Sequence, residues 1–146
     1  MRVSEIMCPD VAVVRADQTI RQAAQMMADI DAGSLPVSDG DRLIGMITDR
    51  DIAVRAVAVG KDGNTPIRDI MTEEVLYCFD DEEVEHVVDN MGDIQVRRLL
   101  VMSREKRLIG IVSIGDLATV HSPESAGVAL SGIAQPGGRH TQASAA

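Results

Sequence analysis

Two short stretches of the chain carry a hydroxyl and a carboxylate three residues apart, each directly after an apolar run. Thr48 and Asp51 form the first pair, and Ser113 and Asp116 form the second. One interpretation is a capping box, in which both side chains satisfy free backbone N–H groups at a helix start. The other is a ligand site, because an exposed helix start attracts phosphate and an adjacent aspartate can accept hydrogen bonds from both ribose hydroxyls. The spacing alone leaves both interpretations open.

The two pairs belong to an internal repeat. Ile6-Met7 returns as Ile70-Met71, and Arg42-Leu43-Ile44-Gly45 returns as Arg107-Leu108-Ile109-Gly110. Self-similarity of this kind is the signature of a repeated structural unit. We therefore expect two copies of one small unit over residues 6 to 118, with one residue added in the loop around 103–106.

The periodicities of the first copy predict the element order β-α-β-β-α. A strand is expected at 11–14, followed by Asp17 as the N-cap of a helix that ends near Gly33. Strands at 35–37 and 43–47 then flank Asp39-Gly40, as in a hairpin with a tight turn. A second helix is expected to start around 48–51. The apolar face of the first helix is predicted to contain Ile20, Ala23, Ala24, Met27 and Ile30.

The second copy predicts the same order, so the fold class is α/β (α+β). It has a strand at 75–78, a cap at Asp80 or Asp81, and strands at 99–101 and 108–112. Its first helix is predicted to bury Val84, Val87, Val88, Met91 and Ile94.

Composition shifts along the chain suggest its organisation. We expect a first domain at 1–60, a linker at 61–66, a second domain at 67–121 and a short C-terminal helix at 122–134. Residues 135–146 are too poor in apolar side chains to compensate for the entropy of ordering, and a disordered tail is expected there.

The charge and hydropathy of the chain exclude two classes of partner. The formal net charge is -9, whereas nucleic-acid binding relies on clustered basic residues. No apolar run approaches the ~20 residues that span a bilayer. We therefore expect a cytoplasmic protein that binds neither nucleic acid nor membrane. Because Tyr77 and Phe79 are the only aromatic residues, a ligand base would be held between aliphatic side chains.

The sequence gives little support to catalysis or metal binding. Cys8 and Cys78 are not at equivalent repeat positions and do not match a metal-ligand spacing. Two reduced thiols are the simplest interpretation, with a thiol redox sensor as an alternative. No histidine pairs by sequence with a cysteine or serine, so we expect no enzymatic activity, no catalytic cofactor and no metal site.

Three motifs in combination resemble the CBS domain. They are Asp69-Ile70-Met71 opening a unit, Leu35-Pro36-Val37 on its middle strand, and the stretch from Gly45 to Asp51 closing it. The resemblance covers about residues 3 to 120 in both copies, and tandem CBS units form a Bateman module. It implies two repeats packed through their sheets as a pseudo-two-fold pair, of the stand-alone bacterial type. It also implies two clefts for adenosine ligands such as AMP, ADP, ATP, NAD or S-adenosylmethionine.

Carried over residue by residue, the resemblance implies that Thr48 and Asp51 hold the ribose and phosphate in one cleft. Ser113 and Asp116 would do so in the other. Each cleft would also use residues of the opposite repeat. For the Asp51 site these are Met71, Thr72, Val75 and Val96, and for the Asp116 site they are Met7, Cys8, Val11 and Gly33.

A basic pair often precedes the middle strand in family members that bind phosphate. Arg97-Arg98 stands there in the second copy, whereas Gly33-Ser34 stands there in the first. The two clefts are therefore expected to differ, with Arg50 as the possible phosphate ligand at the Asp51 site. Ordinary solvated surface charges are the alternative for Arg97 and Arg98.

The function implied by the resemblance is a regulatory or signalling module that binds an adenine nucleotide and shifts the arrangement of its paired units. Family analogy adds a homodimer and an unidentified target protein. Two alternatives stay open. One is a protein-interaction module whose clefts are vestigial, and the other is the thiol redox sensor.

Overall fold

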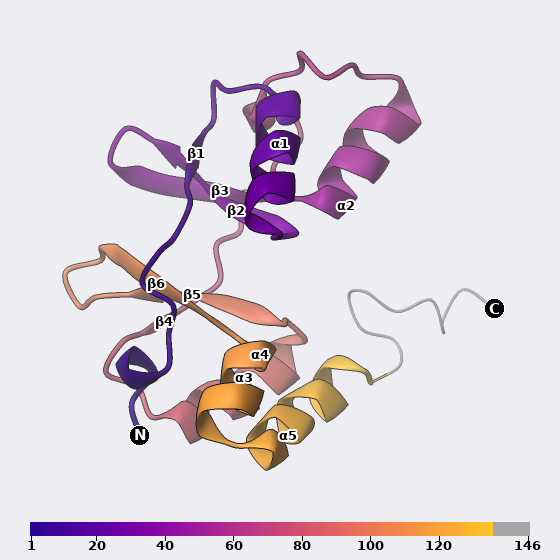
Figure 1. The fold of residues 1–146 in the computed structure, drawn as a ribbon. Coiled ribbons are helices and arrows are strands. Elements are labelled where there is room, and N and C mark those ends of the chain that lie inside the picture. The colour runs from indigo at the N-terminus through magenta and orange to yellow at the C-terminus, as the bar shows by residue number, and fades with distance from the viewer. Residues whose placement is uncertain (136–146) are drawn as a thin grey trace. The chain divides into compact units, whose positions relative to one another are not determined.

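The computed structural model of the protein describes residues 1–135 (Figure 1). These residues form two compact units, each built on a three-stranded sheet. The β1–β3 unit comprises Ala12–Val75, and the β4–β6 unit comprises Met1–Val11 together with the chain from Leu76 onward. No helix in the described part of the chain is long and apolar enough to cross a membrane. All but the first residue of the predicted tail at 135–146 lies outside the described residues.

The β1–β3 unit has the predicted order β-α-β-β-α. In this sheet β2 lies in the middle, parallel to β1 and antiparallel to β3. The final helix changes from α-helical to π-helical geometry after one turn. The elements are β1 (Val14–Arg15), α1 (Ile20–Ile30), β2 (Ser34–Asp39), β3 (Arg42–Thr48), α2 (Asp49–Asp51), a π-helical turn (Ile52–Ala56) and a 3-10 turn (Val57–Val59).

The β4–β6 unit repeats this order and topology, which confirms the predicted fold class. Its middle strand β5 is parallel to β4 and antiparallel to β6. An additional helix, α5, follows the repeat. The elements are β4 (Tyr77–Phe79), α3 (Val84–Ile94), β5 (Arg98–Met102), β6 (Leu108–Ser113), α4 (Ile114–Asp116), a π-helical turn (Leu117–His121) and α5 (Pro123–Ile133).

The first strand of each copy begins later than predicted. β1 starts at Val14 instead of Val11, and β4 starts at Tyr77 instead of Val75. Val14 and Cys78 are buried, whereas Val13 is 39% exposed and outside the sheet. Residues 11–13 therefore precede the sheet, and the strand that follows them is shorter than the apolar run predicted.

The predicted helix caps were also wrong. Thr19, not Asp17, is the N-cap of α1: its hydroxyl accepts the Gln22 N–H at 3.2 Å, and the Gln22 carboxamide oxygen accepts the Thr19 N–H at 2.9 Å. Glu83 precedes α3 without a side-chain cap. Asp81 instead pairs with Arg104 at 2.8 Å, and this hydrogen bond lowers the pKa of the Asp81 carboxyl.

The two first helices bury different amounts of their surface. α3 buries Val88, but Ala24 at the equivalent place in α1 is exposed, as is Ile30, so these two residues were wrongly assigned to the core. The physical reason is α5, which packs against α3 (Figure 1). At this crossing Gly132 is so close to Gly92 that an added Cβ would lie 2.6 Å from the Gly92 Cα.

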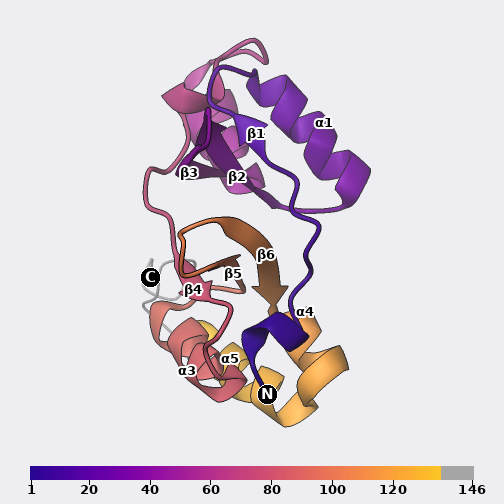
Figure 2. The same cartoon turned by 90° about the vertical axis from the view of Figure 1, so that its left-hand side faces the viewer.

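The segment that opens each repeat packs on the other repeat's elements. Val3 and Ile6 are buried in the core of the β4–β6 unit. Figure 2 shows the N-terminal turn of this unit in indigo. Ile67 and Ile70 are buried in the core of the β1–β3 unit. Each compact unit therefore contains the strands and helices of one repeat and the opening segment of the other.

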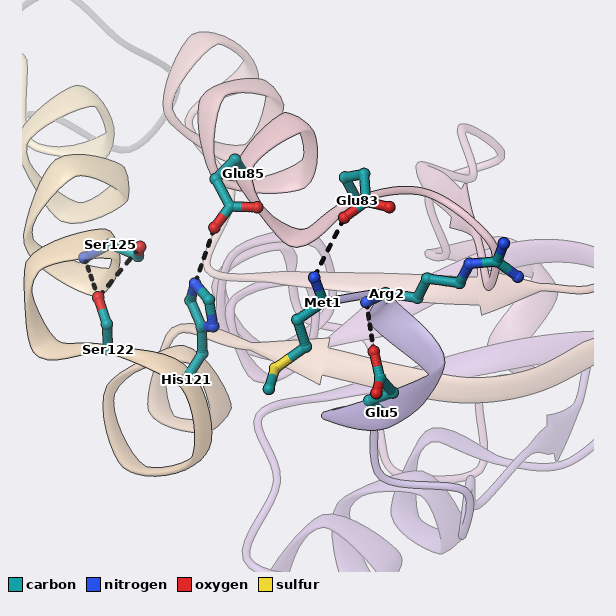
Figure 3. Close-up of polar contacts among 8 residues, drawn as sticks. All are labelled: Met1, Arg2, Glu5, Glu83, Glu85, His121, Ser122 and Ser125. Carbon is teal, nitrogen blue, oxygen red and sulfur yellow. Dashed lines mark hydrogen bonds and ion pairs between the residues drawn. The ribbon is translucent and has the colours of Figure 1, made fainter.

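Polar contacts join the N-terminal segment and the end of the last repeat to the N-terminal end of α3 and the residue before it (Figure 3). The Met1 amine donates to Glu83 Oε2 at 3.2 Å, and this hydrogen bond raises the pKa of the amine. The His121 ring lies 3.0 Å from a carboxylate oxygen of Glu85. The contacts therefore hold three distant parts of the chain together within the β4–β6 unit.

Candidate functional site

Both hydroxyl–carboxylate pairs form capping boxes at the point where a strand ends and a helix begins. The Thr48 hydroxyl accepts the Asp51 N–H at 3.0 Å, and Asp51 Oδ2 accepts the Thr48 N–H at 3.0 Å. The Ser113 hydroxyl accepts the Asp116 N–H at 3.2 Å, and Asp116 Oδ2 accepts the Ser113 N–H at 2.9 Å. The structural interpretation of the motif is therefore confirmed at both places.

The caps do not use all of the carboxylate oxygens. Within residues 1–135, the Asp116 side chain forms its hydrogen bonds through Oδ2 alone, including one with the Ser113 hydroxyl at 3.1 Å. Asp51 Oδ1 lies 3.9 Å from Nη1 of Arg55, and the Asp51 side chain is 13% exposed. Within residues 1–135, no cation is paired with Asp116. A free, half-buried carboxylate oxygen is suited to accepting a ligand hydroxyl.

The opening segments lie directly beside these caps. Thr72 and Met46 exchange two backbone hydrogen bonds of 2.8 and 2.9 Å, and the Met71 carbonyl accepts a hydrogen bond from Arg55 at 3.1 Å. Glycine is needed next to this pair, because a Cβ on Gly45 would lie 2.6 Å from the Thr72 carbonyl oxygen. The structure therefore brings Met71 and Thr72 into the unit that contains Asp51.

The second copy shows the same arrangement. Cys8 and Ile111 exchange backbone hydrogen bonds of 2.8 and 2.9 Å. A Cβ on Gly110 would lie 2.6 Å from the sulfur of Met7. Met7 and Cys8 thus belong with Asp116, as does Val11, which is half-buried in the same unit, while Val75 lies with Asp51.

The residues before the two middle strands occupy matching positions. The Gly33 carbonyl accepts the Asp49 N–H at 2.9 Å, and the Arg97 carbonyl accepts the Ile114 N–H at 3.1 Å. Arg98 stands opposite Ser113 in the sheet register. Arg97 and Arg98 are thereby placed at the Asp116 cap, where both are exposed and, within the described chain, without an acidic partner.

Val96 was predicted for the Asp51 site but lies in the β4–β6 unit, and Gly33 was predicted for the Asp116 site but lies in the β1–β3 unit. The roles of both residues stay predictions. Arg50 is exposed beside the first cap, where its backbone N–H donates to Asp49 Oδ1 at 2.8 Å. Asp49 and Arg55 also lie near that cap and were not among the predicted site residues. Two signals in the sequence could have identified them. Asp49 is an acid where the second repeat has apolar Ile114, and Arg55 follows Asp51 at the four-residue spacing that makes side chains neighbours on a helix.

The two thiols differ in environment. Burial raises the pKa of the Cys78 thiol to about 12, which makes a thiolate at neutral pH unfavourable. Cys8 is exposed, with its sulfur 3.8 Å from the Asp10 carbonyl oxygen. A paired redox switch gains no support from the buried thiol. Among residues 1–135, no group of three or more His, Cys, Asp or Glu side chains is arranged to hold a metal ion.

Comparison with curated proteins identifies close relatives. The chain is 41% identical over 132 residues to the CBS domain-containing protein YhcV of Bacillus subtilis, with 90% of this chain and 94% of YhcV covered. It is 40% identical over 124 residues to Hypoxic response protein 1 of Mycobacterium tuberculosis, with coverages of 84% and 85%.

Solved structures share the fold. The CBS domain protein TA0289 of Thermoplasma acidophilum superimposes with a TM-score of 0.78 at 26% identity, covering 90% of this chain and 75% of that one. PAE2072 of Pyrobaculum aerophilum, solved in complex with AMP, has a TM-score of 0.72 at 25% identity, with coverages of 82% and 92%. The CBS domain pair of MJ0100, solved with 5'-methylthioadenosine and S-adenosyl-L-methionine, has a TM-score of 0.69 at 28% identity, with coverages of 81% and 93%.

The repeat itself matches a known family. Residues 3–57 and 67–122 each match the CBS domain, and together these ranges take in both capping boxes and both opening segments. The resemblance seen in the sequence is thereby confirmed. The chain belongs to the CBS-domain family as a tandem pair.

Proposed function

We propose that the protein is a regulatory module that binds an adenine nucleotide of the AMP, ADP, ATP or NAD class without turning it over. The observation that carries the proposal is the Ser113–Asp116 cap with Arg97 and Arg98 beside it. The aspartate retains an oxygen for ribose hydroxyls, and the two arginines supply positive charge for phosphate. Relatives solved with AMP and with S-adenosyl-L-methionine support the ligand class.

The connectivity of the β4–β6 unit supports a sensing role. Asp116 comes from the second repeat, whereas Cys8, hydrogen-bonded to Ile111, belongs to the opening segment of the first. A ligand that touches both would join segments from the two repeats and favour the arrangement in which both are in place. Differential affinity for that arrangement would shift the population of the module. The readout would pass through a homodimer or an unidentified target protein.

Thermal unfolding tests the proposal. A ligand that binds only the folded state adds about 2.7 kcal/mol of stability at ~100 times its Kd. We expect one or more of AMP, ADP, ATP, NAD and S-adenosylmethionine to raise the melting temperature. GMP at the same concentration serves as the control for the base.

Two other outcomes separate the alternatives. No rise with any adenine ligand would favour the protein-interaction module, in which the capping boxes are purely structural. An equal rise with GMP would show recognition of phosphate and ribose alone and would contradict the adenine assignment.

A further inference from the structure

The two capping boxes share their geometry but differ in the charges around them. At the Asp116 cap, the residues at the start of the middle strand are Arg97 and Arg98, and the first helical residue is apolar Ile114. At the Asp51 cap, the matching residues are Gly33, Ser34 and Asp49. The Asp116 site therefore has two cations at positions where the Asp51 site has none. The Asp51 site has an additional carboxylate, that of Asp49, where the Asp116 site has an apolar residue.

Asp49 and Gly33 fit each other closely. The Asp49 N–H donates to the Gly33 carbonyl at 2.9 Å. An added Cβ on Gly33 would lie 3.0 Å from Asp49 Oδ2. The carboxylate thus occupies space that is available because residue 33 has no side chain, and an arginine there could not be accommodated without moving Asp49.

Two cations, Arg50 and Arg55, adjoin the Asp51 cap: Arg50 is exposed, and Arg55 is engaged by both the cap and the opening segment. Nη1 of Arg55 donates to the Met71 carbonyl at 3.1 Å and lies 3.9 Å from Asp51 Oδ1. The matching residue of the second copy is Val120, which is exposed and uncharged. Arg55 thus balances the charge of Asp51, whereas the Asp49 carboxylate forms no ion pair within residues 1–135.

We infer that the two sites select different ligands and that Asp49 is the specificity-determining residue. The Asp51 site takes an adenosine compound without a phosphate, because the Asp49 carboxylate repels a 5'-phosphate. The Asp116 site takes a phosphorylated one, because Arg97 and Arg98 attract it. This inference rests on the proposed function and adds the ligand class of each site.

Calorimetric titration of the full chain with adenosine and with AMP tests the inference. Asp116→Asn leaves the Asp51 site to be measured, and Asp51→Asn leaves the Asp116 site. We expect Asp116→Asn to bind adenosine more tightly than AMP and Asp51→Asn to show the opposite preference, each by about tenfold or more, the scale of one charge interaction at a partly exposed site.

Matched charge changes then identify the residue responsible. Asp49→Asn in the Asp116→Asn background is expected to strengthen AMP binding about tenfold and leave adenosine binding unchanged. Ile114→Asp in the Asp51→Asn background is expected to weaken AMP binding by a similar factor. Unchanged adenosine affinity in each pair shows that the site is still folded.

Three results would overturn the inference. One is an Asp49→Asn variant with the same ratio of AMP to adenosine affinity as its parent. Another is a preference for AMP over adenosine at the Asp51 site that disappears in Arg50→Ala, which would make Arg50 a phosphate ligand there. Failure of the parent chain to bind either compound would instead overturn the proposed function, and this inference with it.

Discussion

Cys8 and Ile111 lie 103 positions apart in sequence (111 minus 8) yet exchange both of their backbone hydrogen bonds, at 2.8 and 2.9 Å. The matching pair, Met46 and Thr72, does the same in the other unit. These two contacts join each repeat's opening segment to the last strand of the other repeat. They also place main-chain atoms of both repeats close to a capping box, where the ligand is proposed to bind.

Glycine substitutions test how closely the opening segments pack. A Cβ on Gly45 would meet the Thr72 backbone oxygen at 2.6 Å, whereas the nearest atom to a Cβ on Gly110 is the flexible sulfur of Met7. We expect Gly45→Ala to lower the free energy of unfolding by about 2 kcal/mol and Gly110→Ala by about half as much. Urea unfolding of both variants measures the difference. A larger loss in Gly110→Ala would contradict this account of the packing.

The crossing of α5 over α3 gives a second stability prediction. Gly132→Ala would bring a Cβ to 2.6 Å from the Gly92 Cα and force the two helices apart. We expect a loss of about 2 kcal/mol in the free energy of unfolding. Gly127→Ala is the matched control on the same helix, since its Cβ would meet nothing within 4 Å. The control is expected to be neutral or to add up to about 1 kcal/mol. Equal effects of the two changes would show that the helices do not cross this closely.

The buried thiol predicts a dependence of stability on alkaline pH. Burial raises the pKa of Cys78 from 9.0 to about 12, so the folded state keeps the proton that the unfolded state releases above pH 9.0. Stability is therefore lost as the pH rises from about 9 towards 12, by about 1 kcal/mol per pH unit. Cys78→Ala removes this contribution, and its free energy of unfolding should fall less steeply over that range. Parallel curves for the two proteins would contradict the buried, neutral thiol.

The sequence predicted the fold where its signals are redundant. The order β-α-β-β-α was repeated in two copies, and the α3 face of Val84, Val87 and Met91 recurs at helical spacing and is buried. The residues that cap the helices were less predictable. Asp17 and Thr19 are both good N-caps, and the structure uses Thr19 because Gln22 completes a reciprocal pair with it.

Tertiary contacts explain what the sequence could not predict. The exposure of Ala24 depends on the absence of an α5-like helix in the β1–β3 unit, and the close approach of Gly92 and Gly132 has no local signature. At the candidate sites, the hydroxyl–carboxylate pairs were visible as motifs. The proposed role of Asp49 rests on its position beside Gly33, whose carbonyl accepts the Asp49 N–H, and only the folded chain shows this contact.

Calorimetric binding of AMP to the parent chain and to Asp116→Asn tests the central claim most directly. The asparagine carboxamide oxygen can still accept the Ser113 N–H, so the cap is kept while the free carboxylate oxygen is lost. We predict that AMP binds the parent and that Asp116→Asn weakens it at least tenfold, with an unchanged melting temperature of the unliganded protein. Unchanged AMP affinity in Asp116→Asn, or no AMP binding to the parent, would contradict the assignment of Asp116 as a nucleotide ligand.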